Sequence, residues 1–590
     1  MKLLRNRSAA RLSVVVAISA CALIASIPGA LATHGGDREV TVASNDAIFS
    51  QNKQNEPALA VDASHPNVLA AGANDNIDME ACNSGDDTTC PFTPNVGGSG
   101  IYFSFDSGDT WTQPEYTGLT ARGCLGAPGP NDPDCQVVQG PIGTLPHYDE
   151  ANLVSDGDPA LAFGPRPAAD GSFAWENGSR LYYANLTSNV SADLGEPGTK
   201  GFEAIAVSRT DDVAAAAAND ESAWMSPVLA SKQSSATFAD KEQIWADNAS
   251  SSPFFGNVYV CYASFTGNGA APMRVARSSN GGSTWSTKQV SPAHNVAPSH
   301  FGQSGCTIRT DSDGVVYVFW EEFTARSLPT IGTHFMVKST DGGRSWTRPQ
   351  AIRRVTDPCF FIDPVIGRCV EDGVAGARND LAAAPSVDIA NGAPTGDDAT
   401  NFMLTAWADG RDGLNHEHVM VSSSANGGTS WSAPAAIETA GDRGYYAAPA
   451  LSPNGTDAYV VYNAFTTPFR NDTSSPRSLV GVVKHADVVS GGLGAWSTLH
   501  RGATGDPRAS SQNDLQAEFL GDYVYAVATR TYGAAVWNDA RNASDCPAID
   551  AWRASLRTAN PGTRPAPQQD CPATFGNTDI FGWSALDPTP

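Results

Sequence analysis

The sequence predicts an all-β fold assembled from repeated antiparallel units, and two kinds of repeat carry that prediction. A tight-turn frame, S-x-[DN]-x-G-x-[ST]-W, occurs four times along the 590 residues. Short runs rich in β-branched and aromatic residues also recur, and each follows a shorter strand after a turn. Repeated short strands of this kind are typical of sheets of similar size arranged around a common axis.

The turn frame is a hairpin that fastens itself. In the copy at residues 339–346, Asp341 can accept hydrogen bonds from the backbone N–H groups that follow it, and Gly342 and Gly343 permit positive φ. Trp346 then begins the next strand and supplies a large apolar anchor. The other copies lie at residues 104–111, 278–285 and 424–431. Since the frame should occur by chance on the order of 10⁻³ times in such a chain, the copies are a repeat.

The second repeat ends each run in an aromatic residue followed by small, polar or acidic residues. Clear copies lie at residues 183–187, 262–266, 320–324, 407–411, 462–466 and 537–541, with a weaker one at 68–75. The repeats begin near Glu56, Asp158, Asp240, Gly305, Ala384, Ala448 and Gln516. They predict a single β-propeller over residues 39–557, with seven four-stranded antiparallel blades. Six blades are the alternative, because the second and sixth repeats lack a clear turn frame.

The turn frame matches the Asp-box, or BNR, repeat, and the chain resembles the sialidase-like β-propellers that carry it. This resemblance implies that the frame closes the hairpin between the two outer strands of a blade, on the face away from the active site. Sialidases have six blades, so a count of seven departs from them. A strand at residues 39–42 precedes the first repeat, and we expect it to pair with the last blade and close the ring.

The N-terminus has the layout of a secretory signal peptide. Basic residues come first, an apolar run follows at residues 14–27, and Ala30-Leu31-Ala32 supplies a cleavage site after residue 32. We therefore expect a secreted product, and lipoprotein anchoring through Cys21 is the alternative. No later stretch has the ~20 apolar residues that a membrane span requires.

The mature chain is strongly acidic. Without residues 1–32, 33 basic residues face 62 acidic ones, for a formal charge of −29. A nucleic-acid or anionic-membrane partner is not expected, because both need basic patches. Structural calcium is compatible with this acidity, although no EF-hand pattern occurs, and no cofactor is required. We expect a monomer.

Ten cysteines follow the signal region, an even number that suits a disulfide framework in an exported chain. Their spacing predicts pairs between neighbours, and no C-x₂-C zinc pattern occurs. The expected pairs are Cys82–Cys90, Cys124–Cys135, Cys261–Cys306, Cys359–Cys369 and Cys546–Cys571. The last pair would tether a Pro-rich tail at residues 558–590.

Long insertions predict where the functional site lies. In a blade, the start of the innermost strand and the end of the second strand share one face, and the turn frames take the other. The insertions at residues 76–98, 118–150 and 352–380 and the loop of Cys546 all fall on the first face. Disulfides would stiffen this rim, so one mouth of the channel is the candidate site.

Charged and polar residues gather at that mouth and suit a polar, hydroxylated ligand. The repeat ends supply Asn74, Asp75, Glu321, Glu322, Asp409, Arg411, Asp539 and Arg541, and the innermost strands supply Glu56, Asp158, Asp240, Lys241 and Glu242. A structural interpretation stands beside this one. The two Asp-x-Arg pairs would fasten loops, Lys241 would form a local ion pair with its neighbours, and Glu56 would be a solvated strand end.

The resemblance to sialidases implies specific roles, although the F-R-I-P motif of that family is absent. Tyr523 would be the nucleophile, with Glu518 and Asp522 as its acidic partners, and Arg326, Arg411 and Arg541 would grip a substrate carboxylate. The chain would then be an exo-sialidase-type glycoside hydrolase acting on extracellular glycans. The alternative is a non-catalytic extracellular propeller that uses the channel mouth to bind a ligand or protein.

Overall fold

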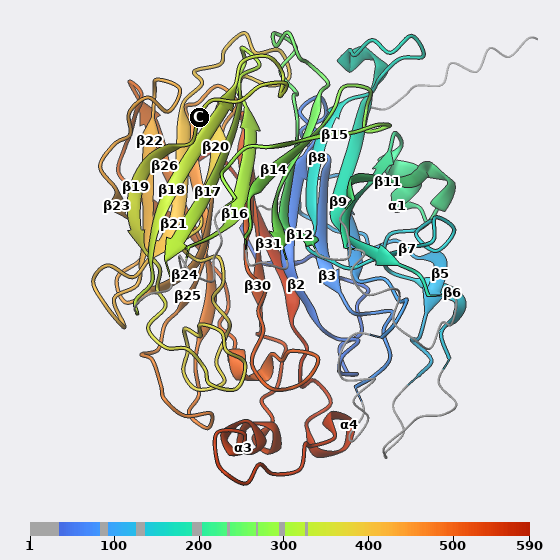
Figure 1. Cartoon of the computed structure of the whole chain (residues 1–590), viewed down its shortest axis with the longest axis vertical. Coiled ribbons are helices and arrows are strands. Elements are labelled where there is room, and N and C mark those ends of the chain that lie inside the picture. The colour runs from blue at the N-terminus through green and yellow to red at the C-terminus, as the bar shows by residue number, and fades with distance from the viewer. Residues whose placement is uncertain are drawn as a thin grey trace, which may run out of the picture. The chain divides into compact units, whose positions relative to one another are not determined.

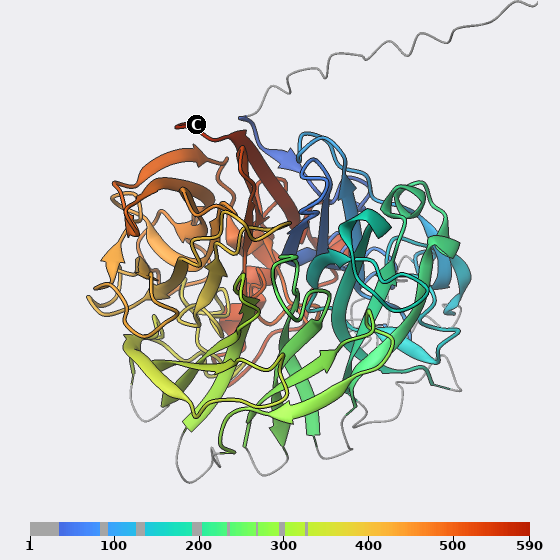
Figure 2. The same cartoon turned by 90° about the horizontal axis from the view of Figure 1, so that it is seen from above.

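Seven antiparallel blades make up the described part of the chain, and Figure 2 shows them arranged in a ring. This computed structural model describes residues 35–82, 93–124, 136–191, 203–232, 237–266, 270–293, 301–324 and 328–590. Each blade contains one of the seven sequence repeats. The predicted seven-bladed β-propeller is therefore confirmed, and the six-bladed alternative is wrong.

Within each blade, neighbouring strands are hydrogen-bonded in antiparallel pairs, and Figure 1 labels most of them. Blade 1 consists of β2 (Gln54–Val61), β3 (Leu69–Asp75) and β4 (Ser99–Ser104). Blade 2 consists of β8 (Ala160–Pro165), β9 (Ser179–Asn189), β10 (Ala204–Thr210) and β11 (Trp224–Lys232). Blade 3 consists of β12 (Thr237–Ala246), β13 (Val258–Thr266), β14 (Met273–Ser278) and β15 (Ser286–Gln289). Blades 4 and 5 consist of β16 (Phe301–Thr310), β17 (Val316–Thr324), β18 (Ile331–Ser339) and β19 (Gln350–Thr356), and of β20 (Ser386–Ile389), β21 (Met403–Asp409), β22 (His418–Ser424) and β23 (Ala435–Ala436).

Blades 6 and 7 complete the ring. They consist of β24 (Arg443–Leu451), β25 (Asp457–Phe465), β26 (Leu479–Val489) and β28 (Ser497–Arg501), and of β29 (Tyr525–Ala528), β30 (Tyr532–Asp539), β31 (Asp579–Leu586) and β1 (Arg38–Glu39). Additional short elements are β5 (Tyr116–Thr120), β6 (Val138–Ile142), β7 (Leu153–Ser155), β27 (Gly492–Leu493), α1 (Val213–Ala217), α3 (Pro547–Ser555) and α4 (Pro567–Asp570). None of the helices in the described ranges is long and apolar enough to cross a membrane.

Large aromatic side chains on the second strands fill the space between blades. These are the residues that the second sequence repeat singles out, and each is at most 1% exposed: Tyr183, Tyr262, Trp320, Trp407, Tyr462 and Trp537. Burying a side chain of this size contributes roughly 2–3 kcal/mol through its apolar surface. The repeat is therefore a packing pattern, and it sets the spacing of the blades.

The turn frame forms the self-fastened hairpin that the sequence predicts. The Oδ1 atom of Asp341 accepts hydrogen bonds from the backbone N–H groups of Arg344 (2.9 Å) and Ser345 (2.8 Å). The N–H group of Gly343 donates to the Oγ atom of Ser339 at 2.8 Å. Gly343 has a φ of 84°, in the left-handed region that favours glycine. This hairpin joins β18 to β19, the two outer strands of blade 4.

The ring closes by pairing the two ends of the chain. Strand β1 pairs with β31, and the N–H group of Val40 donates to the carbonyl of Ile580 at 2.8 Å. The expectation that the N-terminal strand joins the last blade is thus confirmed. However, β31 is itself the third strand of that blade, so residues 558–590 are not a tail and the sheet extends past residue 557. The Pro-rich stretch belongs to the long connection between β30 and β31.

The three disulfides between described residues match predicted pairs. They are Cys261–Cys306, Cys359–Cys369 and Cys546–Cys571. The first joins the second strand of blade 3 to the innermost strand of blade 4. Cys82 and Cys124 are also disulfide-bonded. Their expected partners, Cys90 and Cys135, lie outside the described residues, so those pairings stay predictions.

The turn frame yields a stability prediction with its own control. Replacing Asp341 by Ala removes the acceptor of two backbone hydrogen bonds and should lower the free energy of unfolding by about 1–2 kcal/mol. Asp341→Asn should cost less than about 0.5 kcal/mol, because Asn280 and Asn426 accept the corresponding bonds in two other frames, each at 3.0 Å. Urea denaturation would measure both. Equal losses in the two variants would contradict the proposed role of the acceptor.

Candidate functional site

The innermost strands of blades 1 to 3 direct three charged side chains into one mouth of the channel. Glu56, Asp158 and Lys241 all have left-handed backbones, with φ values of 57°, 53° and 56°. Glu56 and Lys241 lie in bulges, where β2 and β12 each shift register against their second strand. A left-handed conformation costs about 1–2 kcal/mol for a residue with a side chain. Three such residues at one place mark a candidate functional site.

The ammonium group of Lys241 is the centre of this cluster. Its Nζ atom lies 2.6 Å from Asp522 Oδ2 and 3.2 Å from Asp158 Oδ2. Glu56 Oε1 and Asp240 Oδ1 are each 3.9 Å away. The sequence suggested a local ion pair for this lysine. Instead, its carboxylate neighbours come from blades 1, 2, 3 and 7, so it joins distant parts of the chain.

Asp522 is held as an anion between two cations. Besides Lys241, the NH2 group of Arg378 lies 2.7 Å from its Oδ2 atom, and the hydroxyl of Tyr446 donates to Oδ1 at 3.3 Å. Burial alone would raise the pKa of Asp522, but Arg378 and Lys241 hold it below its usual range. The preceding residue, Gly521, has a φ of 84°, and a Cβ atom there would lie 2.5 Å from Glu56 Cγ. Glycine is therefore needed for blade 7 to approach blade 1.

Three neighbouring carboxyl groups differ in protonation. Burial, reinforced by the charge of Asp158, raises the pKa of Glu56 well above its usual value. Burial also raises the pKa of Asp240, to about 7. Asp158 behaves in the opposite way, since Lys241 and a hydrogen bond from Glu56 lower its pKa despite burial. The mouth therefore holds an ionised carboxylate between two carboxyl groups that retain protons near neutral pH.

The connection between β19 and β20, residues 357–385, reaches this cluster through Arg378, a residue that the sequence analysis missed. Arg378 lies on this loop, which the Cys359–Cys369 disulfide braces. Its guanidinium lies 4.4 Å from the ring of Phe519, and its carbonyl accepts hydrogen bonds from Tyr445 and Tyr446. The position of the loop was predictable. No motif marks Arg378 itself, because the partner Asp522 is 144 residues away.

A cavity continues from the cluster into the channel. Its lining includes Lys241, Glu242, Cys306, Tyr446, Asp522 and Tyr523. Neither carboxyl oxygen of Glu242 has a hydrogen-bond partner among the described residues. Burial raises the pKa of Glu242 well above its usual value, which favours the protonated form of this side chain. It can both donate to and accept from a polar group that enters the cavity.

The predicted nucleophile and its helper lie apart. Tyr523 lines the cavity, where burial and then the charge of Asp158 raise the pKa of its hydroxyl further. Glu518 interacts instead with Asp372, Arg477 and Arg553, and burial raises its pKa to about 8. No hydrogen bond joins Glu518 to Tyr523 in the described part of the chain. A carboxylate positioned to take the phenol proton is what activation would require.

The two predicted substrate-binding arginines bind their own aspartates. In Asp409–Arg411 the Oδ2–NH2 distance is 2.6 Å, and Asp539–Arg541 repeats it at 2.6 Å. The indole N–H groups of the preceding tryptophans also donate to these aspartates, each at 2.9 Å. The guanidinium of Arg541 stacks 3.9 Å from the ring of Phe581 on β31, an outer strand.

This geometry favours the structural interpretation of both Asp-x-Arg pairs. The third predicted arginine, Arg326, lies outside the described residues. Among the described residues, the hydrogen bonds of Arg411 and Arg541 go to aspartates and none goes to Tyr523, so their role in binding a substrate stays a prediction.

Two groups of side chains in the described ranges could hold a metal ion. One is Asp457, His485 and Asp487, and the other is Glu39, Asp46 and Asp579. Neither includes a residue of the mouth cluster. They are the positions at which the expectation of a structural cation can be tested.

Comparison with known proteins finds likeness at the level of fold. No protein-family model and no curated protein matches the sequence. Similar solved structures include a Hadza microbial sialidase, with 13% identity over 70% of this chain and 63% of that one and a TM-score of 0.38. The Trypanosoma rangeli sialidase in complex with the inhibitor DANA shares 11% identity over 78% and 60%, with a TM-score of 0.37.

An α-L-arabinanase from Penicillium chrysogenum, complexed with arabinobiose, shares 13% identity over 72% of this chain and 93% of that one, with a TM-score of 0.37. This chain spans less than two thirds of the length of either sialidase. At TM-scores of 0.37 to 0.38, this likeness assigns the chain no activity.

The protonation pattern predicts a pH dependence of stability. The pKa of Asp240 is raised in the folded state, so the unfolded chain releases this proton first, and stability falls as pH rises from about 4 to about 7. Asp240→Asn cannot titrate and should flatten that decline by roughly 1–3 kcal/mol across the window. Urea denaturation at several pH values would measure the slope.

The control variant is Asp522→Asn. Because the pKa of Asp522 is lowered on folding, its stabilisation is fully present above about pH 4 and is lost only as pH falls through the folded value. This variant should be less stable by a nearly constant amount between pH 4.5 and 7. If the free energy of unfolding of Asp240→Asn falls with rising pH as steeply as that of the wild type, Asp240 is not protonated in the folded protein.

Proposed function

We propose that this chain is an exported, glycan-directed glycoside hydrolase whose site is the channel mouth around Lys241. The observation that carries the proposal is the pairing of a protonated Asp240 with an ionised Asp158. Glycoside hydrolysis needs a carboxylic acid to protonate the leaving oxygen and a carboxylate to stabilise the positive charge that develops on the sugar. Below about pH 7 Asp240 retains its proton, whereas the pKa of Asp158 is lowered and favours its ionised form.

Exposure decides which carboxyl groups can meet a substrate. The side chains of Asp240 and Asp158 are 21% and 11% exposed, whereas those of Glu56 and Asp522 are 2% and 0% exposed. We assign Asp240 as the general acid, because a pKa near the working pH suits proton transfer. Asp158 is the ionised partner. Lys241, Glu56 and Asp522 position these two groups from beneath.

The charge of the mouth favours a neutral sugar over a sialoside. The cations of Lys241 and Arg378 are already engaged by Asp522, and further carboxyl groups surround them. A substrate carboxylate would find no free cation there, because Lys241 and Arg378 already pair with Asp158 and Asp522. The arginines that would grip it in a sialidase-type site are bound to Asp409 and Asp539. The substrate panel therefore also includes sialosides, which test for exo-sialidase activity.

Export is part of the proposal. It is supported by the disulfides, which are typical of oxidising compartments, and by the signal-peptide layout of residues 1–32. The substrates would then be extracellular glycans or glycoconjugates. A non-catalytic binding propeller remains the competing function, because Lys241 and Arg378 already occupy the centre of the mouth.

Activity on a substrate panel tests the proposal. The wild-type protein should hydrolyse at least one neutral aryl glycoside or oligosaccharide, and activity should fall as pH rises through about 7, where Asp240 loses its proton. Asp240→Asn and Asp158→Asn should each lower kcat/KM by about 10²–10⁴-fold. Because Asp158 also pairs with the buried Lys241, kcat/KM is compared at a temperature at which the wild type and both variants are fully folded.

Asp409→Asn is the control, since that aspartate binds Arg411 and lies outside the cluster. This variant should lower stability, and its kcat/KM should stay within about threefold of the wild-type value. A well-folded wild type that is inactive on every neutral glycoside and sialoside would refute the hydrolase. Turnover of sialosides alone would establish the sialidase-type activity and refute the neutral substrate.

A further inference from the structure

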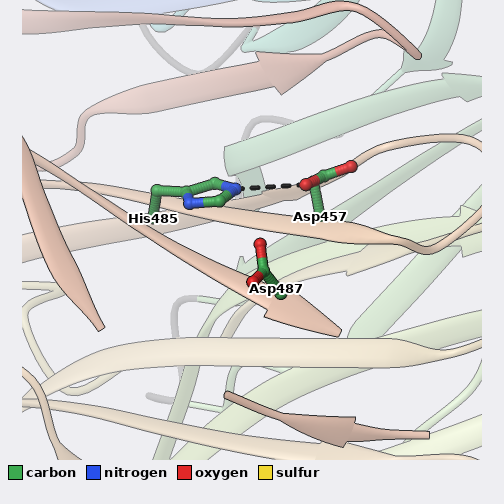
Figure 3. Close-up of side chains that lie close together, drawn as sticks. All are labelled: Asp457, His485 and Asp487. Carbon is green, nitrogen blue, oxygen red and sulfur yellow. Dashed lines mark hydrogen bonds and ion pairs between the residues drawn. The ribbon is translucent and has the colours of Figure 1, made fainter. Parts of the chain in front are cut away.

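Blade 6 carries an unusual arrangement of charge on its second and third strands. Across the β25–β26 pair, Asp457 lies directly opposite Asp487, and Tyr459 lies opposite His485. Two like charges directly opposite each other destabilise a sheet. Figure 3 shows the imidazole of His485 directed toward the carboxylate of Asp457, with Asp487 beside them. One nitrogen of His485 and one oxygen of each aspartate all lie within 4.8 Å of one another.

A fourth ligand comes from the other end of the fold. Asp587 directly follows β31 of blade 7, and its Oδ1 atom lies 3.9 Å from His485 Nε2. Asp457 Oδ1 lies 3.1 Å from the same nitrogen. The side chains of His485, Asp457 and Asp587 are 4%, 6% and 8% exposed. In the described part of the chain no lysine or arginine pairs with these aspartates, so their negative charge is largely unbalanced.

A separate observation at the same place concerns Tyr459. This residue is 1% exposed, and its hydroxyl has no hydrogen-bond partner among the described residues. Its ring centre lies 5.0 Å from that of His485, and the charges that act on it are Asp457, Asp587 and Asp487. Leaving a buried hydroxyl unpaired is unfavourable. A donor that finds no partner beside three carboxylates indicates that a further group belongs at this position.

We propose that Asp457, His485, Asp487 and Asp587 bind one divalent transition-metal ion, of the Zn²⁺ or Mn²⁺ type. A divalent ion offsets the repulsion between Asp457 and Asp487. The imidazole favours a transition metal over Ca²⁺, which takes oxygen ligands, and one nitrogen with carboxylate oxygens suits Zn²⁺ or Mn²⁺. A water molecule bound to the ion could accept a hydrogen bond from the unpaired hydroxyl of Tyr459. The site is distinct from the channel mouth and from the proposed hydrolysis.

The metal would act as a clasp between blades 6 and 7. Strand β31 comes from the C-terminal end of the chain and is held on one side by β1, a strand of two residues. The segment after β31 contacts neighbouring strands through Asp587 N–H to the carbonyl of Thr531, at 2.8 Å, and through Thr589 Oγ1 to Asp487 Oδ1, at 2.5 Å. An ion shared by Asp587 and blade 6 would fix the last strand in the ring.

Metal titration of the full chain tests this inference. After treatment with a chelator, the wild-type protein should bind about one Zn²⁺ or Mn²⁺ per chain by isothermal titration calorimetry, and its melting temperature should rise with metal concentration. Ca²⁺ should bind more weakly. His485→Ala should weaken binding by at least about 100-fold, and Asp587→Asn by about 10-fold or more.

The matched control is His418→Ala. His418 is also an imidazole between two carboxylates, with Asp412 Oδ2 and Glu438 Oε1 each 2.7 Å away, but it lies on β22 of blade 5. Its loss should leave the affinity unchanged. The inference is overturned if the wild type binds no transition metal, or binds it equally well without His485 or Asp587. If His485→Ala does not fold, Asp587→Asn and the metal-dependent melting shift of the wild type decide the question.

Discussion

The buried ammonium of Lys241 is the interaction on which the centre of the ring depends. A charge removed from water is strongly destabilising unless it is paired and hydrogen-bonded. Here the partners Glu56, Asp158 and Asp522 come from blades 1, 2 and 7, and the lysine from blade 3. Any slip of one blade against the next would leave this charge unpaired. The network therefore fixes the arrangement of four blades and, with it, the geometry of the mouth.

The same network explains why the fold was easier to predict than the site. Turn frames and buried aromatics act through neighbouring residues, so Asp341 or Trp407 can be recognised from a few letters of sequence. Lys241 was predicted to pair with Asp240 and Glu242, and nothing local indicates that Asp522, 281 residues away, is its closest partner. Arg378 was missed for the same reason. β31 was assigned to a tail because prolines precede it and no turn frame accompanies it.

Whether a charged pair is interpreted as a ligand contact or as a structural pair also depends on the other hydrogen bonds that its members make. Asp409–Arg411 and Asp539–Arg541 were predicted either as ligand contacts or as loop fasteners. In both, a buried indole N–H binds the aspartate from behind, and the arginine folds back onto it. Each guanidinium is thereby paired with the aspartate two residues before it, and Arg541 also pairs with Asp37. A cation committed in this way contributes little to gripping a substrate carboxylate, so likeness of fold to sialidases need not bring their substrate preference.

The two acidic clusters of this protein differ in how their charge is balanced. At the mouth, Lys241 and Arg378 are the cations, and the remaining excess is reduced because Glu56 and Asp240 retain protons. On blade 6 the basic group that pairs with Asp457 and Asp587 among the described residues is the imidazole of His485. The pKa of Asp457 is lowered, chiefly by its hydrogen bond from His485, against the effect of burial. Protons suit a site that performs acid–base chemistry, because they can be transferred. A bound divalent ion would suit the proposed clasp, because it would hold two strands together.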